Sequence, residues 1–279
     1  NQSVGNIITD KNQVFVMYGP DKEGFVIPSE SEIEATVLAA QKKQYEPYQE
    51  EKIPSTLISA LPKPGKIVSE KPYGKFDMTE ITLSNGMKVY VKPTDYQADQ
   101  VMMSMRAEGG TSLYGNEDIP NFSLLTSAIT EAGVGDFSAT ALRKALAGKS
   151  IRLTPSISSE GQRIAGSSSV KDMETMLQLA HLYFMAPRKD SVAFEGLKNR
   201  TLSFLKNRNA SSKVVYNDSL SAVLYDHNLR MAPVTGEVLA KADYGRIMEI
   251  YRERFSDASN FKTVFIGKID MAELRPLLC

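Results

Sequence analysis

The chain has little of the chemistry that most active sites use. Of its 279 residues, two are histidine, one is cysteine and none is tryptophan. The single cysteine, Cys279, excludes an internal disulfide bond but does not decide the compartment. The apolar runs are short and interrupted by charge, so we expect no membrane span. Lys plus Arg and Asp plus Glu both number 33, and this neutral balance gives no electrostatic reason to expect nucleic acid or an anionic membrane as the main partner.

The few ligand-type side chains are not arranged as a metal site. His181 and His227 are far apart in the sequence, and neither has a partner at the spacing of H-E-x-x-H or H-x-x-E-H. His181 lies at the edge of an apolar helical stripe, which favours a packing role. His227 follows a predicted helix end, where the helix dipole mildly favours a cation. Cys279 has no neighbouring base that would make it a nucleophile. The residues alone therefore predict no catalytic residue, no metal ligand and no cofactor in this chain.

The first third of the chain does not form a complete domain by pattern. Residues 13–18 are rich in β-formers, and a helix is predicted from about 28 to 45; one strand and one helix cannot bury a core alone. Residues 46–75 hold five prolines, which favours an extended linker and argues against a regular helix or a central strand. Apolar side chains within this linker predict that it lies against a surface: Leu57, Ile58, Leu61 and Ile67.

The main domain is predicted to begin near Phe76. Two β-rich runs around Asn85-Gly86 predict a hairpin, and "VMMSMRAEGG" predicts a third strand with Met102, Met103 and Met105 in the core. Further strands are predicted on both sides of Glu160-Gly161 and at 262–267. Helices are predicted in 118–133, 138–148, 171–187, 191–210, 212–226 and 243–256. Antiparallel strands, grouped helices and a returning strand predict an α+β fold, mostly an antiparallel sheet with helices packed on it.

The helix "DIPNFSLLTSAITEAG" at 118–133 has clear boundary signals. Asp118 is a candidate cap, Pro120 suits the first turn and Gly133 suits the end. One face is apolar, with Phe122, Leu125, Ala128, Ile129 and Ala132 at helical spacing. The opposite face carries Ser123, Thr126, Ser127 and Thr130.

The order of these elements resembles one repeat of the pitrilysin/insulinase family of zinc peptidases. The phrases that carry the resemblance include "LSNGMKVYVKP", "MSMRAEGGTS", "TEAGVGDFSATALRKAL" and "FEGLKNRTLSFLKNR". Members of this family pair repeated α+β domains into two halves that close around a peptide chamber. The resemblance implies that 1–45 is the C-terminal strand and helix of a preceding repeat and that 46–75 is the linker between halves. It implies that 76–279 is a metallopeptidase-like domain of the LuxS/pitrilysin type, truncated in its last helix.

The resemblance also implies where a zinc motif would lie. In the catalytic repeat, H-x-x-E-H occupies the helix that corresponds here to Ile119–Ala132, and a further ligand corresponds to Glu195. The side chains found along this helix include Asn121, Phe122, Leu124 and Leu125, which cannot replace two imidazoles and a general base. No metal role is therefore carried over to this chain.

The implied function is a non-catalytic segment of a zinc metallopeptidase. The partners would be the catalytic N-terminal half of the same protein, which holds the zinc, and the peptide substrate. The chain alone is predicted to be inactive, and Ser123, Thr126, Ser127 and Thr130 are the predicted chamber-facing positions. Bacterial relatives are often periplasmic or otherwise exported, and the same localisation is implied here.

Two alternatives remain open at this point. A catalytically inactive scaffold or assembly subunit of the same family fits the residues equally well, and the zinc motif elsewhere in the full reading frame would discriminate between the two. A free-standing small-molecule-binding domain fits less well, because the chain has no cofactor motif and residues 13–45 would be unexplained.

Overall fold

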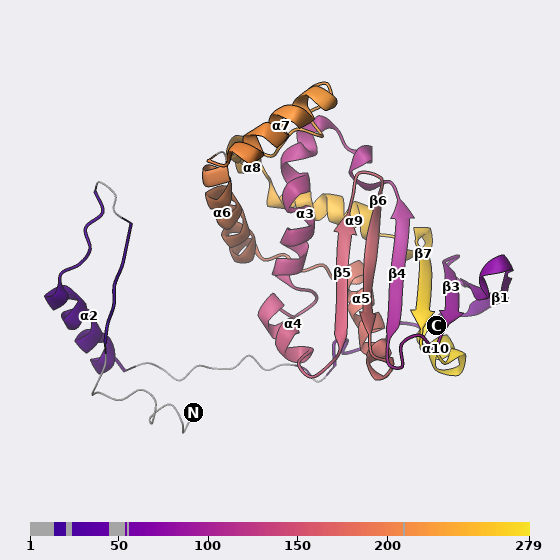
Figure 1. The fold of residues 1–279 in the computed structure, drawn as a ribbon. Helices are drawn as coiled ribbons and strands as arrows, with labels where there is room; N and C mark the ends of the chain where they lie inside the picture. Colours follow the sequence, from indigo (N-terminus) through magenta and orange to yellow (C-terminus); the bar gives the residue numbers. More distant parts are fainter. Residues whose placement is uncertain (1–13, 21–23, 45–53, 55, 209) are drawn as a thin grey trace. The chain divides into compact units, whose positions relative to one another are not determined.

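The chain divides into two units, Asn1–Glu50 and Glu51–Cys279, in a computed structural model (Figure 1). The structure describes residues 14–20, 24–44, 54, 56–208 and 210–279. Within this part of the chain, no helix has both the length and the apolar character needed to cross a bilayer.

The first unit contains one described helix, α2, which spans Glu30–Lys42. Its start is fixed by the Glu32 carboxylate, which accepts hydrogen bonds from the Ser29 backbone N–H at 2.8 Å and the Ser29 hydroxyl at 2.7 Å. The helix predicted at 28–45 is thus confirmed over 30–42. None of its residues is buried, so it brings no core of its own.

The prediction of a strand at 13–18 is wrong for residues 14–18, the part of it that the structure describes. Residues 14–20 have no regular structure, and the side chains of Val14, Phe15, Val16, Met17 and Tyr18 are exposed. A strand is stable only when it pairs with another, and no described residue of this unit pairs with it. β-forming residues alone were therefore an insufficient signal.

The second unit is built on a seven-stranded sheet in the order β1-β2-β3-β7-β4-β6-β5 (Figure 1). The strands are β1 Ile67–Tyr73, β2 Met78–Leu83, β3 Lys88–Pro93, β4 Val101–Glu108, β5 Ile151–Ile157, β6 Gly161–Ser168 and β7 Lys262–Gly267. Only β3 and β7 pair in parallel, so the predicted mostly antiparallel sheet of an α+β fold is confirmed. The returning strand β7 lies between β3 and β4, in the middle of the sheet.

The first strand of this sheet corrects the expectation for the Pro-rich segment. Residues 67–73 form β1, which pairs antiparallel with β2, although Pro72 lies within it. β1 is an edge strand, where proline is tolerated because one side of the strand needs no hydrogen-bonded partner. The expected packing of this segment is confirmed for Leu57, which is buried, and for Ile58 and Ile67, which are half-buried. It is wrong for Leu61, whose side chain is exposed.

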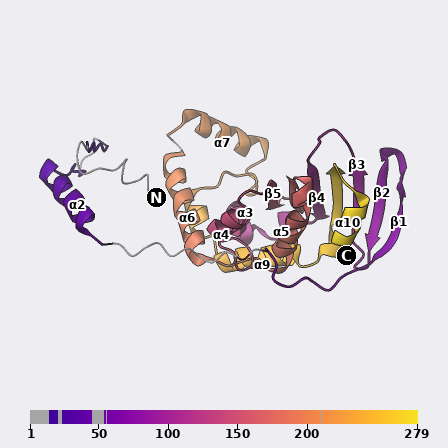
Figure 2. The same ribbon diagram turned by 90° about the horizontal axis from the view of Figure 1, so that it is seen from below.

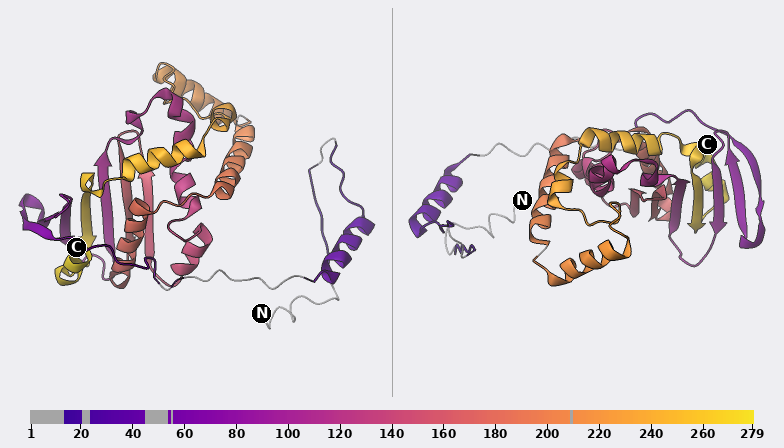
Figure 3. Two further views of the ribbon diagram at one scale, coloured as in Figure 1. Left: turned by 180° about the vertical axis from the view of Figure 1, so that it is seen from behind. Right: turned by 90° about the horizontal axis from the view of Figure 1, so that it is seen from above.

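The helices of the second unit lie mainly on one side of the sheet and at its β5 edge. They are α3 Ile119–Ala132, α4 Ala139–Ala145, α5 Met173–Met185, α6 Ser191–Arg208, α7 Ser212–Leu224, α8 Gly236–Ala240, α9 Tyr244–Phe255 and α10 Met271–Leu277. The short α8 was not predicted. Figures 2 and 3 show that α6 and α7 extend from the β5 edge and that α7 stands on the opposite side from α9.

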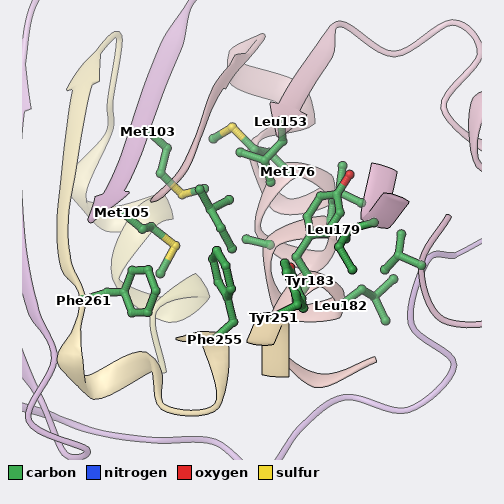
Figure 4. Packing of buried hydrophobic residues seen from close by; sticks show 14 of the residues in the cluster. Met103, Met105, Leu153, Met176, Leu179, Leu182, Tyr183, Tyr251, Phe255 and Phe261 are labelled. Carbon is green, nitrogen blue, oxygen red and sulfur yellow. The ribbon is translucent and has the colours of Figure 1, made fainter. Parts of the chain in front are cut away.

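The core lies between the sheet and helices α5 and α9 (Figure 4). Met103 and Met105 point into it from β4, whereas Tyr251 and Phe255 enter from α9. The Tyr251 hydroxyl donates to the Tyr183 carbonyl oxygen at 2.9 Å, so the polar tip of this buried ring is satisfied. The opposite face of the sheet, turned to the viewer in Figure 1, is crossed by no helix of the described residues.

Candidate functional site

The helix that would carry a zinc motif, α3, is packed on several sides. It contacts α6, α8, α9 and β5, and it buries Asn121, Leu124 and Leu125. Phe122 is half-buried, and the Arg230 guanidinium lies 5.6 Å from its ring centroid. These side chains fill space between elements and offer no nitrogen, oxygen or sulfur set suited to zinc. In the part of the chain that the structure describes, no cluster of three or more His, Cys, Asp or Glu side chains could hold a metal ion.

The other residues singled out by the sequence are dispersed. His181 is half-buried on α5, whereas His227 is exposed and has a left-handed backbone with φ of 55°. Glu195 is exposed on α6, and Cys279 is exposed at the C-terminus. The structure forms no common site from these residues.

A buried ion pair occupies the start of α3. Asp118 is 5% exposed, and Arg246 of α9 donates to both of its carboxylate oxygens, at 3.0 and 2.9 Å. Asn121 donates to the same carboxylate at 3.2 Å and accepts from the Asp243 backbone N–H at 2.8 Å. The hydrogen bonds from Arg246 hold the pKa of Asp118 below its usual value. The expectation that Asp118 caps α3 is therefore wrong, because its carboxylate makes no cap hydrogen bond and serves Arg246 instead.

The loop after β4 is fixed to the same part of α9. Tyr114 donates to the Glu253 carboxylate at 2.7 Å, and the guanidinium groups of Arg246 and Arg254 lie 5.5 and 5.6 Å from its ring centroid. Burial, followed by the hydrogen bond to Glu253, raises the pKa of Tyr114 to about 12. These contacts join the loop after β4 to α9 and so hold the start of α3 in place.

The predicted chamber-facing stripe of α3 is at least partly accessible. Ser123 is exposed, whereas Thr126, Ser127 and Thr130 are half-buried. The Thr130 hydroxyl lies 3.2 Å from the carbonyl oxygens of both Thr126 and Ser127, to which it can donate. That this stripe faces a chamber stays a prediction.

The uncovered face of the sheet is a second candidate surface that the sequence did not indicate. Along β4, Met103 and Met105 are buried, but Met102 is 46% exposed, so the expectation that all three methionines lie in the core is wrong for Met102. Strands β5, β6, β4 and β7 line a shallow hollow of about 480 Å³ on this face. Its lining is apolar at Met102, Val264 and Ile266 and cationic at Arg152 and Arg163. Such a surface can hold an extended chain with both apolar and acidic side chains.

The chain is similar in sequence to zinc proteases. No family model matches the sequence. A zinc protease PQQL-like protein of Arabidopsis thaliana is 26% identical over 241 residues, which cover 85% of this chain and 22% of the relative. A probable zinc protease PqqL of Haemophilus influenzae is 23% identical over 242 residues, which cover 86% of this chain and 26% of the relative. The chain thus spans about a quarter of the length of the curated relatives it matches.

The fold is similar to solved structures of the same group. The periplasmic protease PqqL from Escherichia coli matches with a TM-score of 0.70 and 18% identity, over 90% of this chain and 28% of that one. A peptidase M16 inactive domain from Pseudomonas fluorescens matches with a TM-score of 0.59 and 15% identity, over 72% of this chain and 49% of that one. Together with the two sequence relatives, these matches confirm the resemblance of the sequence to the pitrilysin/insulinase family of zinc peptidases, and they show that the chain has the fold of a domain of this group.

Proposed function

We propose that this chain is a non-catalytic segment of a zinc metallopeptidase that forms part of the wall of its substrate chamber. The observation that carries the proposal is the contrast between two surfaces. The positions on α3 that correspond to a zinc motif hold buried Asn121, Leu124 and Leu125, whereas the other face of the sheet is hollowed and no helix of the described residues of the second unit crosses it. A domain of this kind binds and encloses peptide without cleaving it.

The catalytic work would belong to another half of the protein. Bound zinc supplies an activated water for peptide hydrolysis in such enzymes. Because α3 offers no ligands for it, the zinc is assigned to the N-terminal half that would pair with this chain. The contribution of the present residues is to hold peptide and to exclude water when the two halves close.

The first unit supports a place within a larger protein. Its described residues expose apolar side chains that an isolated domain would bury: Val14, Phe15, Val16, Met17, Tyr18, Phe25, Val26 and Ile27. We assign 1–45 to the end of a preceding repeat, 46–75 to the connection between halves, and 76–279 to the third repeat, to whose sheet the last part of the connection adds the edge strand β1. The periplasmic location of the E. coli relative supports a periplasmic or otherwise exported protein.

Zinc content and cleavage of unfolded casein test the proposal. The 279-residue chain and the natural full-length protein are purified, and zinc per chain is measured by mass spectrometry. We expect no stoichiometric zinc and no cleavage from the chain alone. The full-length protein should cleave casein in a zinc-dependent way and lose this activity when 51–279 is deleted. One zinc per isolated chain would overturn the proposal, and a full-length protein without zinc would favour the scaffold alternative.

A further inference from the structure

The uncovered sheet face carries a row of cations that only the strand register reveals. Lys88 of β3 lies opposite Lys262 of β7, Lys262 lies opposite Arg106 of β4, and Arg106 lies opposite Arg163 of β6. Four neighbouring strands thus each place one cation in the same row, which we call the cation row. All four residues are exposed, whereas their chain neighbours Val89, Thr263, Met105 and Ile164 are buried on the helix side.

Repulsion within the cation row is expected to destabilise the sheet, because few nearby carboxylates offset its charge. Like charges directly opposite each other on neighbouring strands are destabilising. Within the described residues, no carboxylate lies within ion-pair distance of Arg106, Arg163 or Lys262, and Lys88 has only Glu80 at 3.7 Å. The chain as a whole has equal numbers of cations and anions, so composition does not explain the clustering.

Carboxylates near the row are few or already engaged. Glu108 follows Arg106 on the same strand, and Glu253 and Asp257 line the adjoining hollow together with Arg106 and Lys262. Glu253 accepts from Tyr114, and Asp257 accepts from the Ser259 backbone N–H at 2.8 Å. On the other side of the row lie the apolar side chains of Met102, Val264 and Ile266.

We propose that the cation row binds an acidic segment of an extended polypeptide laid across the strands. The proposal rests on the proposed function, since it names the substrate class that this chamber wall would favour. Neighbouring strands are about 4.8 Å apart, so the row is about 14 Å long, and side chains on one side of an extended peptide repeat about every 6.8 Å. Three alternating carboxylates therefore match the row in length. Arg106 and Arg163 can bind carboxylates in a bidentate way, and the neighbouring apolar strip accommodates the intervening residues.

Fluorescence anisotropy with the full 279-residue chain tests this proposal. The probes are labelled alternating peptides of about 12 residues: Glu-Ser, its neutral counterpart Gln-Ser, and Lys-Ser. The Glu-Ser peptide should bind at least about tenfold more tightly than the Gln-Ser peptide, and its affinity should fall between about 50 and 300 mM salt. Equal binding of Glu-Ser and Gln-Ser would overturn the proposal.

Paired variants assign the binding to the row. Arg106→Gln with Arg163→Gln should weaken Glu-Ser binding about tenfold or more. The matched control is Arg143→Gln with Arg252→Gln, which removes the same charge from exposed positions on α4 and α9 and should change the affinity less than about twofold. An equal loss in the two double variants would mean that net charge alone binds the peptide, which contradicts the proposal.

Charge reversal separates a lost site from a lost fold. Arg106→Glu with Arg163→Glu should bind the Lys-Ser peptide in preference to Glu-Ser. The control Arg143→Glu with Arg252→Glu changes the net charge equally and should not show this preference. If the wild-type chain does not bind Glu-Ser but the full-length protein cleaves casein with zinc, only the preference for acidic peptides is overturned. If the chain binds Glu-Ser but the full-length protein contains no zinc, peptide binding by the cation row is supported and the assignment to a peptidase is overturned.

Discussion

Arg246 is the residue on which the start of α3 depends. It donates one hydrogen bond to each carboxylate oxygen of the buried Asp118, and it lies over the ring of Tyr114. Arg246→Ala would leave a buried carboxylate without a cation. We expect it to lower the free energy of unfolding by about 2–3 kcal/mol, less than for a fully buried pair because a third of the Arg246 side chain is exposed. Urea denaturation measures this change. Arg252→Ala, an exposed arginine on the same helix, is the control, and an equal loss there would contradict the assignment.

The Asp172 carboxylate is expected to make the free energy of unfolding sensitive to acid. Its carboxylate accepts from the Ser169 hydroxyl at 2.6 Å and from the Ser150 backbone N–H at 2.9 Å, and these bonds hold its pKa below the usual value. A lowered folded-state pKa stabilises the fold above the unfolded-state pKa, near 3.9, and this stabilisation is lost as pH falls through the folded-state value. Asp172→Asn should therefore flatten the decline of unfolding free energy below about pH 5.

Denaturation in urea from pH 6 to pH 3 checks the prediction for Asp172. Asp136→Asn serves as control, because Asp136 is exposed, and its curve should follow the wild type. If Asp172→Asn declines as steeply as the wild-type chain, the hydrogen-bonded carboxylate is not the source of the acid sensitivity.

The central position of strand β7 predicts that two Phe→Ala substitutions differ strongly in their effect on the free energy of unfolding. It lies between β3 and β4, and its Phe265 is fully buried. Phe265→Ala should lower the free energy of unfolding by about 3–5 kcal/mol through lost burial and a residual cavity. Phe204→Ala on α6 removes the same atoms from a side chain that is 70% exposed, and it should cost less than about 0.5 kcal/mol. Chemical denaturation of both variants tests the pair, and similar values would contradict the central position of β7.

Elements with a local signal were predictable from the sequence, and elements that depend on distant partners were not. Asn85-Gly86 specified the β2–β3 hairpin, and Ser138 caps α4 through a 3.1 Å hydrogen bond from the Ala141 N–H. By contrast, the β-rich residues at 14–18 form no strand, whereas the Pro-containing residues 67–73 do. Strand formation in both segments depends on whether a neighbouring strand offers hydrogen bonds, which no local pattern encodes.

The candidate site likewise combines a feature that the local sequence predicts with features that depend on distant residues. The absence of zinc ligands on α3 could be read directly from the residues once the resemblance had located the helix. The ion pair of Asp118 and Arg246 joins residues 128 positions apart, and no spacing rule connects them. The cation row requires that β7 pair with both β3 and β4, so Lys262 meets Lys88 and Arg106 only in the folded sheet. Surfaces built across strands were therefore beyond prediction from one sequence.

At the scale of the whole molecule, the two units predict separate contributions to stability and to association. Among the residues that the structure describes, every buried residue of the core cluster lies at or after Leu57, and α2 buries no residue. Deletion of 1–50 should therefore leave the unfolding free energy of the remaining chain unchanged within about 0.5 kcal/mol. The same deletion should reduce self-association, because it removes the exposed apolar side chains of 14–18 and 25–27.

Light scattering and urea denaturation of the deleted and intact chains test both parts of this expectation. The matched control keeps the full length and replaces only Phe15 and Val16 by serine, which separates apolar exposure from chain length. If this variant self-associates less while its unfolding curve is unchanged, the exposed apolar side chains are the cause of association. A loss of more than about 1 kcal/mol on deletion would mean that the first unit stabilises the second, contrary to the distribution of the core. In a complete preceding repeat, the apolar residues of 14–18 would be covered. Self-association of the isolated chain through these exposed side chains is therefore what the proposed place within a larger peptidase predicts.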